Sequence, residues 1–195
     1  MSSIRPAKNR STGETESTAL HRRPVEEADD SKFAIGLTKQ ADVALAALHE
    51  SPLDLLPDSN DVRLVRILFM PTFHSNVLIV VEALQAVARI ACIMSGTAPR
   101  REENTLATAE LDALWVATQA VVESNEAATT AEAGMPVRID IDDWSGRRTI
   151  AGVVAIGNGP VGELVDRMVA LVRGNLPDDE IEQALTDVER YLIRD

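Results

Sequence analysis

Residues 135–174 constrain the fold of this chain most, because they predict two strands, a Gly-rich loop and a helix in unbroken succession. Apolar β-branched residues alternate with charged residues over 136–143, which is the period-two pattern of a strand with one buried face. A second β-branched run follows at 147–156, and apolar residues at helical spacing occupy 160–173. Because an isolated two-stranded hairpin is only marginally stable in water, we expect helices of the same chain to cover it.

The composition indicates one soluble domain with an aliphatic core. The chain has 195 residues, of which 45% are hydrophobic and only 3% aromatic, so the core must be built from Leu, Val, Ile and Ala. This favours closely packed helices over an aromatic ligand site. The formal net charge of −12 disfavours binding to nucleic acid or to an anionic membrane, since such binding depends on Lys and Arg neutralising phosphates.

Residues 1–30 contain few branched apolar residues and are rich in Ser, Thr, Arg and Glu. This composition predicts a disordered N-terminal arm ahead of a single domain at 31–195. The first 23 residues carry two glutamates and five basic side chains: Arg5, Lys8, Arg10, Arg22 and Arg23. A solvated tail is the favoured interpretation, and a docking arm is the alternative.

Neither secretion nor a membrane span is predicted. The arm has no apolar segment of signal-peptide length. In the most apolar part of the chain, Glu82, Gln85 and Arg89 leave no uninterrupted window of about 20 apolar residues. Cys92 is the single cysteine, so the sequence offers no disulfide framework and no cysteine metal cluster. We therefore expect a cytoplasmic protein.

The most apolar part, residues 61–95, is interrupted once by Pro71. After this proline, apolar residues recur at helical spacing, which predicts a central, largely buried helix over 77–94. The preceding run 62–70 fits either a helix kinked at Pro71 or a buried strand, because periodicity does not separate the two. We favour the helix, although a strand here would give the hairpin a third partner.

The other segments alternate between helical patterns and loops. Helices are predicted at 31–49, 105–130, 160–173 and 178–193, and breaker residues predict a loop at 96–104. The expected fold class is therefore α+β and mostly α, with a bundle of about five helices packed on the β-hairpin.

A Gly-rich loop lies between the second strand of the hairpin and its helix. Gly157, Gly159 and Gly162 have the spacing G-x-G-x-x-G, which is similar to the dinucleotide-binding fingerprint, where glycines let the backbone approach a pyrophosphate. That fingerprint also needs a second parallel strand, whereas the chain continues here as a helix, and Pro160 removes one amide. A tight strand-to-helix connection is the favoured interpretation, and a cofactor-binding loop is the alternative.

Two carboxylates on the first hairpin strand are the candidate metal ligands. Asp140 and Asp142 stand at i and i+2, so they project from the same face about 7 Å apart. That spacing suits one Mg²⁺ bridged through water and a substrate phosphate. The sequence places no third acid or lysine to complete the site, so the wet face of an amphipathic strand is the favoured interpretation.

The sequence contains no other catalytic pattern. His21, His49 and His74 have no ligand-spaced partner, and neither a Ser-centred elbow nor a Cys with a placed His occurs. The only tryptophans, Trp115 and Trp144, are predicted to be packing or interface anchors.

The lack of a catalytic constellation favours a non-enzymatic protein–protein interaction or regulatory protein without a cofactor. We expect it to self-associate as a homodimer, through the edge of the hairpin or the apolar face of the helix at 77–94. The alternative is a small nucleotide- or Mg²⁺-dependent enzyme that uses Asp140, Asp142 and the loop at 157–162. A third, weaker hypothesis is a nucleic-acid regulator that acts through the basic arm.

Overall fold

The computed structural model describes residues 25–57, 61–124, 134–154 and 159–192, without the side chains of 25–32 and 34. The elements in chain order are α1 (Val25–Ala47), the 3-10 turn η1 (Leu53–Leu55), β1 (Val62–Phe69), β2 (Val77–Leu84), β3 (Val87–Met94), β4 (Arg100–Leu106), α2 (Thr108–Ser124), β5 (Met135–Asp143), β6 (Gly146–Val154), α3 (Gly159–Asn175) and α4 (Asp179–Tyr191). The described chain is therefore a mixed fold of helices and strands.

The strands form one six-stranded sheet in the order β4-β3-β2-β1-β5-β6, and every neighbouring pair is antiparallel. In the centre of the sheet, Ile67 of β1 stands opposite Ile79 of β2 on one side and Ile139 of β5 on the other. The hairpin predicted at 136–156 is present as β5 and β6, and β1 is its third strand.

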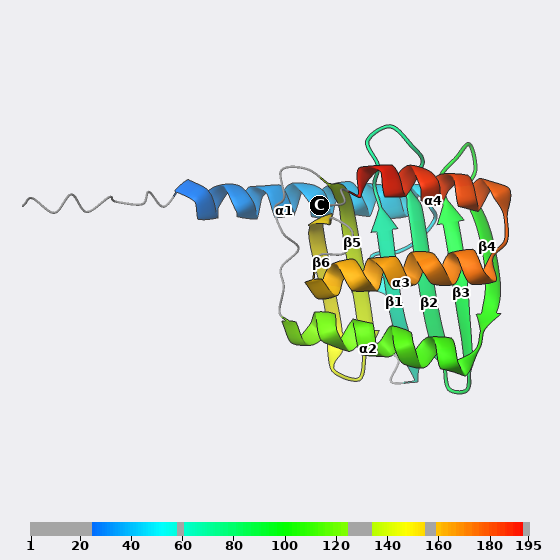
Figure 1. Ribbon diagram of the computed structural model, residues 1–195. Coiled ribbons are helices and arrows are strands. Elements are labelled where there is room, and N and C mark those ends of the chain that lie inside the picture. The colour runs from blue at the N-terminus through cyan, green and yellow to red at the C-terminus, as the bar shows by residue number, and fades with distance from the viewer. Residues whose placement is uncertain (1–24, 58–60, 125–133, 155–158, 193–195) are drawn as a thin grey trace, which may run out of the picture.

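Three helices cover one face of the sheet, which we call the three-helix face. Figure 1 shows α2, α3 and α4 lying across the strands on this side. Their apolar stripes, such as Leu164 and Met168 of α3, pack in one core with Val65, Ile67 and Phe69 of β1. Burying a side chain of this kind stabilises a fold by about 1.5–3 kcal/mol, so this core is the main source of stability.

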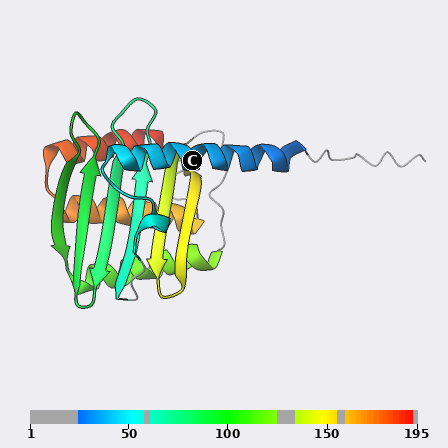
Figure 2. The ribbon, with the colours of Figure 1, turned by 180° about the vertical axis from the view of Figure 1, so that it is seen from behind.

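A single helix lies on the opposite face, which we call the α1 face. Figure 2 shows α1 crossing one end of the strands and extending outward beyond the β6 edge. Ala44 and Leu45 of α1, and Leu48 directly after this helix, belong to a second apolar cluster with Leu68 and Leu78 of the sheet. The far ends of β2, β3 and β4 have no helix over them on this face (Figure 2).

The predicted helical bundle on a hairpin is wrong, because residues 62–106 form four strands. The run 62–70 is β1, the segment predicted as a helix at 77–94 is the hairpin β2–β3, and the predicted loop 96–104 contains most of β4. β2 has buried apolar residues on both of its faces, so its sequence lacks the regular apolar–polar alternation that identifies a strand. The turn at Gln85 also lacks the usual Gly or Asn, although Gln85 has a positive φ of 54°.

The described helices overlap each of the four other predicted helical segments. α1 begins at Val25, so the boundary placed at residue 31 falls inside this helix, and residues 1–24 of the predicted arm lie outside the described residues. At the other end of the chain, Asp178 caps α4 by accepting hydrogen bonds from the backbone amides of Glu180 and Ile181. None of the described helices combines the length and the apolar character that a membrane span requires.

Chemical labelling of the Cys92 thiol tests the packing of the three-helix face. Burial raises the pKa of this thiol from its ordinary value of 9.0 to about 12, and the negative charge of Asp178 adds to the effect. The reactive species is the thiolate. We therefore expect no labelling of the native protein by a thiol reagent such as Ellman's reagent at pH 8, and full labelling in guanidinium chloride. Rapid labelling of the native protein would contradict this packing.

Candidate functional site

Asp140, one of the two candidate metal ligands, is at the centre of an ion-pair cluster on the α1 face. Its carboxylate accepts hydrogen bonds from Arg66 Nε (2.7 Å), Arg138 Nε (2.9 Å) and Thr149 Oγ1 (2.7 Å). Asp140 is only 1% exposed, and both arginines are buried with it. Arg138 also forms an ion pair with Asp42 of α1. Asp140 and Asp42 together thus balance the charges of the two buried arginines, and Arg138 links the sheet to the helix that covers it.

Asp142, the second candidate ligand, is also engaged by an arginine. Its Oδ2 atom accepts a hydrogen bond from Arg147 Nε (2.9 Å), and Arg147 donates further to the carbonyl oxygens of Leu53, Leu56 and Pro57 around η1. In the part of the chain that the structure describes, no group of three or more His, Cys, Asp or Glu side chains is arranged to hold a metal ion. Magnesium binding by Asp140 and Asp142 stays a prediction.

The three glycines of the loop before α3 are only partly described. Gly157 lies outside the described residues, Gly159 is the first residue of α3 with a φ of 66°, and Gly162 is buried in the first turns of that helix. The strand before them belongs to an antiparallel sheet, and α3 is followed by α4. A cofactor-binding role for these glycines stays a prediction.

The residues that the sequence predicts as packing or interface anchors meet in a pocket of about 730 Å³. Its lining includes Arg63 of β1, Asp112 and Trp115 of α2, and Asp143 and Trp144 at the β5–β6 turn. We call it the tryptophan pocket. The guanidinium carbon of Arg63 lies 3.3 Å from the ring centroid of Trp144 and 4.2 Å from that of Trp115. Both distances are short enough for cation–π attraction, so Arg63 stacks on both tryptophans.

Local structure places these side chains at one end of the sheet. Arg63 is two residues before Val65, whose side chain packs in the core of the three-helix face, so Arg63 projects from the same face toward α2. Trp144 is at the tip of the β5–β6 turn, where Asp143 stands opposite Gly146. Gly146 has a φ of 115°, a conformation that side chains other than glycine adopt at a cost, and the backbone amide of Ser145 donates to Asp143 Oδ1 (2.7 Å). The turn therefore fixes the position of Trp144.

The pocket is exposed and carries an excess of negative charge. Trp144 is 75% exposed although it stacks on Arg63, so the other side of its ring is open to solvent. Burial lowers the pKa of the Arg63 guanidinium, and the nearby Asp143 acts in the opposite direction. Arginine nevertheless stays charged at neutral pH. The charged residues of the lining are Asp61, Arg63, Asp112, Asp142, Asp143 and Arg147, which gives a formal charge of −2.

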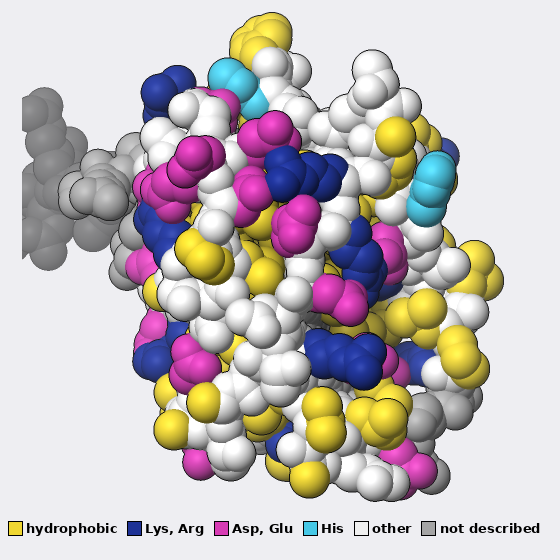
Figure 3. Space-filling model, turned by 90° about the vertical axis from the view of Figure 1, so that its right-hand side faces the viewer, with side chains coloured by type: hydrophobic (Ala, Val, Ile, Leu, Met, Phe, Trp, Pro, Cys, Tyr) yellow, Lys and Arg dark blue, Asp and Glu magenta, His cyan; other side chains and the backbone are white. Residues whose placement is uncertain are grey.

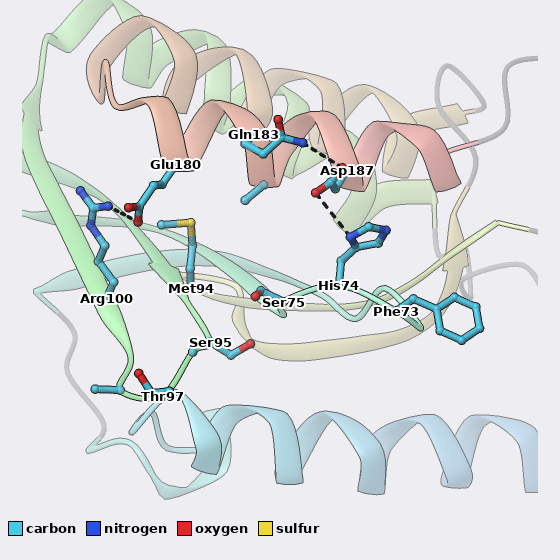
Figure 4. A pocket seen from close by; sticks show the side chains of 13 residues that line it. Phe73, His74, Ser75, Met94, Ser95, Thr97, Arg100, Glu180, Gln183 and Asp187 are labelled. Carbon is cyan, nitrogen blue, oxygen red and sulfur yellow. Dashed lines mark hydrogen bonds and ion pairs between the residues drawn. The ribbon is translucent and has the colours of Figure 1, made fainter.

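A second hollow, of about 870 Å³, lies at the other end of the sheet between α4 and the β1–β2 loop. Figure 4 shows His74 pointing toward Asp187, with Nδ1 3.4 Å from the carboxylate, and Gln183 donating to the same acid. At the far end of the groove Arg100 pairs with Glu180. The pairs His74–Asp187 and Arg100–Glu180 connect α4 to the sheet side of the groove, so they stabilise the position of this helix.

Comparison of the chain with models of protein families and with curated proteins gives no match. The candidate site therefore depends on geometry alone. The sequence identifies Trp115 and Trp144 as anchors, but nothing in their spacing relates them to each other or to Arg63. The pairing of β1 with β5, which depends on recognising β1 as a strand, brings Arg63 to Trp144, and the packing of α2 on the three-helix face adds Trp115.

Replacement of Asp140 by Asn tests the buried ion-pair cluster. This variant leaves Arg66 buried without a balancing charge and Arg138 with Asp42 as its remaining acidic partner, and loss of one partner from a buried pair costs about 3–5 kcal/mol. We expect that decrease in the free energy of unfolding, measured by urea denaturation. The matched Asp142→Asn variant breaks a more exposed pair with Arg147 and should cost about 1 kcal/mol or less. Equal losses in the two variants would contradict this interpretation.

Proposed function

We propose that this protein is a non-enzymatic interaction protein that self-associates, with the tryptophan pocket at the centre of the contact surface. The observation that carries this proposal is Trp144, which is 75% exposed yet held in one position by Arg63. Tryptophan and arginine are the residue types that most often dominate the binding energy of protein interfaces. A pre-positioned side chain also loses little conformational entropy on binding.

The two edges of the sheet support the same location. Charged residues occupy the β4 edge, where Arg101 forms ion pairs with Glu50 and Glu103. Figure 3 shows basic and acidic side chains interspersed over that side of the molecule. Such charges oppose strand pairing between molecules. The opposite edge is β6, which begins two residues after Trp144. A contact centred on Trp144 therefore adjoins the hairpin edge that the sequence predicts as an interface.

The other predicted contact, an apolar helical face at 77–94, is withdrawn because these residues are strands. Nothing observed favours the alternative enzyme: Asp140 and Asp142, the carboxylates it would use, both bind arginines of the fold. Cys92 is the single cysteine of the sequence, so the chain has no internal disulfide, which supports the cytoplasmic location that we propose.

Replacement of Trp144 by Ala tests the proposed contact. We expect sedimentation velocity to show concentration-dependent association of the wild-type chain, and the dissociation constant of the variant to rise at least tenfold because an interface anchor is lost. The fold should be retained, since the side chain is largely exposed. Phe73→Ala is the matched control, because Phe73 is 84% exposed and follows β1 at the opposite end of the sheet.

A wild-type chain that stays monomeric at all concentrations would contradict self-association. Association that is unchanged in Trp144→Ala, or weakened equally in Phe73→Ala, would contradict the location of the contact.

A further inference from the structure

We infer that the tryptophan pocket binds the basic N-terminal segment, residues 1–24, of a second copy of this chain, through an arginine or lysine side chain on the open face of Trp144. This inference rests on the proposed function, because it names the partner of the same pocket. It makes the self-association a reciprocal exchange of arms between two molecules.

The pocket already binds the kind of group that the inference requires. The guanidinium of Arg63 stacks on one side of Trp144 at 3.3 Å from the ring centroid, and Asp143, the last residue of β5, directly precedes this tryptophan. The opposite side of the ring is open to solvent, as the 75% exposure of Trp144 requires. A second cation on that side would meet the same aromatic surface, with the carboxylate of Asp143 close to it.

Charge complementarity selects the N-terminal segment as the occupant. Five basic and two acidic side chains give residues 1–24 a formal charge of +3, so the other 171 residues carry −15 of the total of −12. The tryptophan pocket itself has a formal charge of −2. The segment is thus the one strongly basic stretch of an acidic chain. The tryptophan pocket is acidic and aromatic, so it complements the charge of this segment.

The placement of α1 favours a pocket on another molecule. α1 begins beyond the β6 edge and runs back over the sheet (Figures 1 and 2), so the point at which residues 1–24 join the described chain is on the outer side of that edge. The tryptophan pocket is at the end of the sheet that α1 does not cross, where β1 begins and the β5–β6 turn lies. A segment of 24 residues spans up to about 80 Å when extended, which is enough to reach a neighbouring molecule.

Exchange between two copies is also stronger than a single contact. In a two-fold symmetric dimer each molecule gives one arm and receives one, so two weak contacts form together. Once the first arm is bound, the second binds at a high effective concentration. Modest cation–π and ionic contacts therefore suffice for a stable dimer.

The first experiment uses the full-length chain with its arm neutralised: Arg5→Gln, Lys8→Gln, Arg10→Gln, Arg22→Gln and Arg23→Gln. We expect sedimentation velocity to show a dissociation constant at least tenfold higher than that of the wild type. The control keeps the arm's charge with Arg5→Lys, Arg10→Lys, Arg22→Lys and Arg23→Lys, and should associate within about threefold of the wild type, because both cations stack on tryptophan.

The second experiment uses the fluorescence of the neutralised variant. Trp115 and Trp144 are the only tryptophans, so intrinsic fluorescence reports on this pocket alone. A synthetic peptide of residues 1–24 should give a saturable fluorescence change whose midpoint rises several-fold between 50 and 300 mM salt, because the contact is ionic. The midpoint should rise about tenfold when Asp112→Asn and Asp143→Asn are added. A peptide with glutamine at the five basic positions should give no change.

Three results would overturn the inference. The first is a neutralised variant that associates with the same dissociation constant as the wild type. If Trp144→Ala still weakened association in that case, the proposed function would stand and only the inference about the arm would fall. The second is binding of the peptide with an unchanged midpoint in the variant that carries Asp112→Asn and Asp143→Asn, because it would place the arm outside the tryptophan pocket. The third is a difference in fluorescence between the wild type and the neutralised variant that is the same at all protein concentrations, because it would place the arm in the pocket of its own molecule.

Discussion

The pairing of Arg66 with Asp140 is the interaction on which the arrangement of the sheet depends. The two residues stand directly opposite each other on β1 and β5, and each is almost fully buried. A slip of one residue between these strands would move Asp140 and Arg138 together to the three-helix face and leave Arg66 as an uncompensated charge under α1. The ion pair therefore fixes the register of β1 and β5. Through Arg138 and Asp42 it also fixes where α1 docks.

The same register assembles the candidate binding surface. With Arg66 opposite Asp140, Leu64 stands opposite Asp142, and the β5–β6 turn is brought level with the start of β1. This places Trp144 over Arg63, while α2 supplies Trp115 from the three-helix face. Stability and the proposed contact are thus coupled: a charge pair in the middle of the sheet sets the position of an aromatic anchor at its end.

How far the sequence predicts this structure depends on how many faces of each segment are buried. The alternation of Val137, Ile139 and Ile141 with polar residues identifies β5, although two of those polar residues, Arg138 and Asp140, are buried and paired. β2 and β3 carry apolar residues on both faces, so their spacing fits a helix equally well. The tryptophan pocket is not predictable from spacing, because Arg63, Trp115 and Trp144 come from β1, α2 and the β5–β6 turn, which only the folded chain brings together.

Hydrogen–deuterium exchange at two protein concentrations, one below and one above the midpoint of association, tests the central claim most directly. Exchange reports local protection of backbone amides throughout the chain. Our account predicts that the β5–β6 turn, residues 143–147, becomes protected at the higher concentration, whereas the β1–β2 loop, residues 70–76, does not change. Protection of the β1–β2 loop or of β4, with an unchanged β5–β6 turn, would contradict a contact centred on the tryptophan pocket.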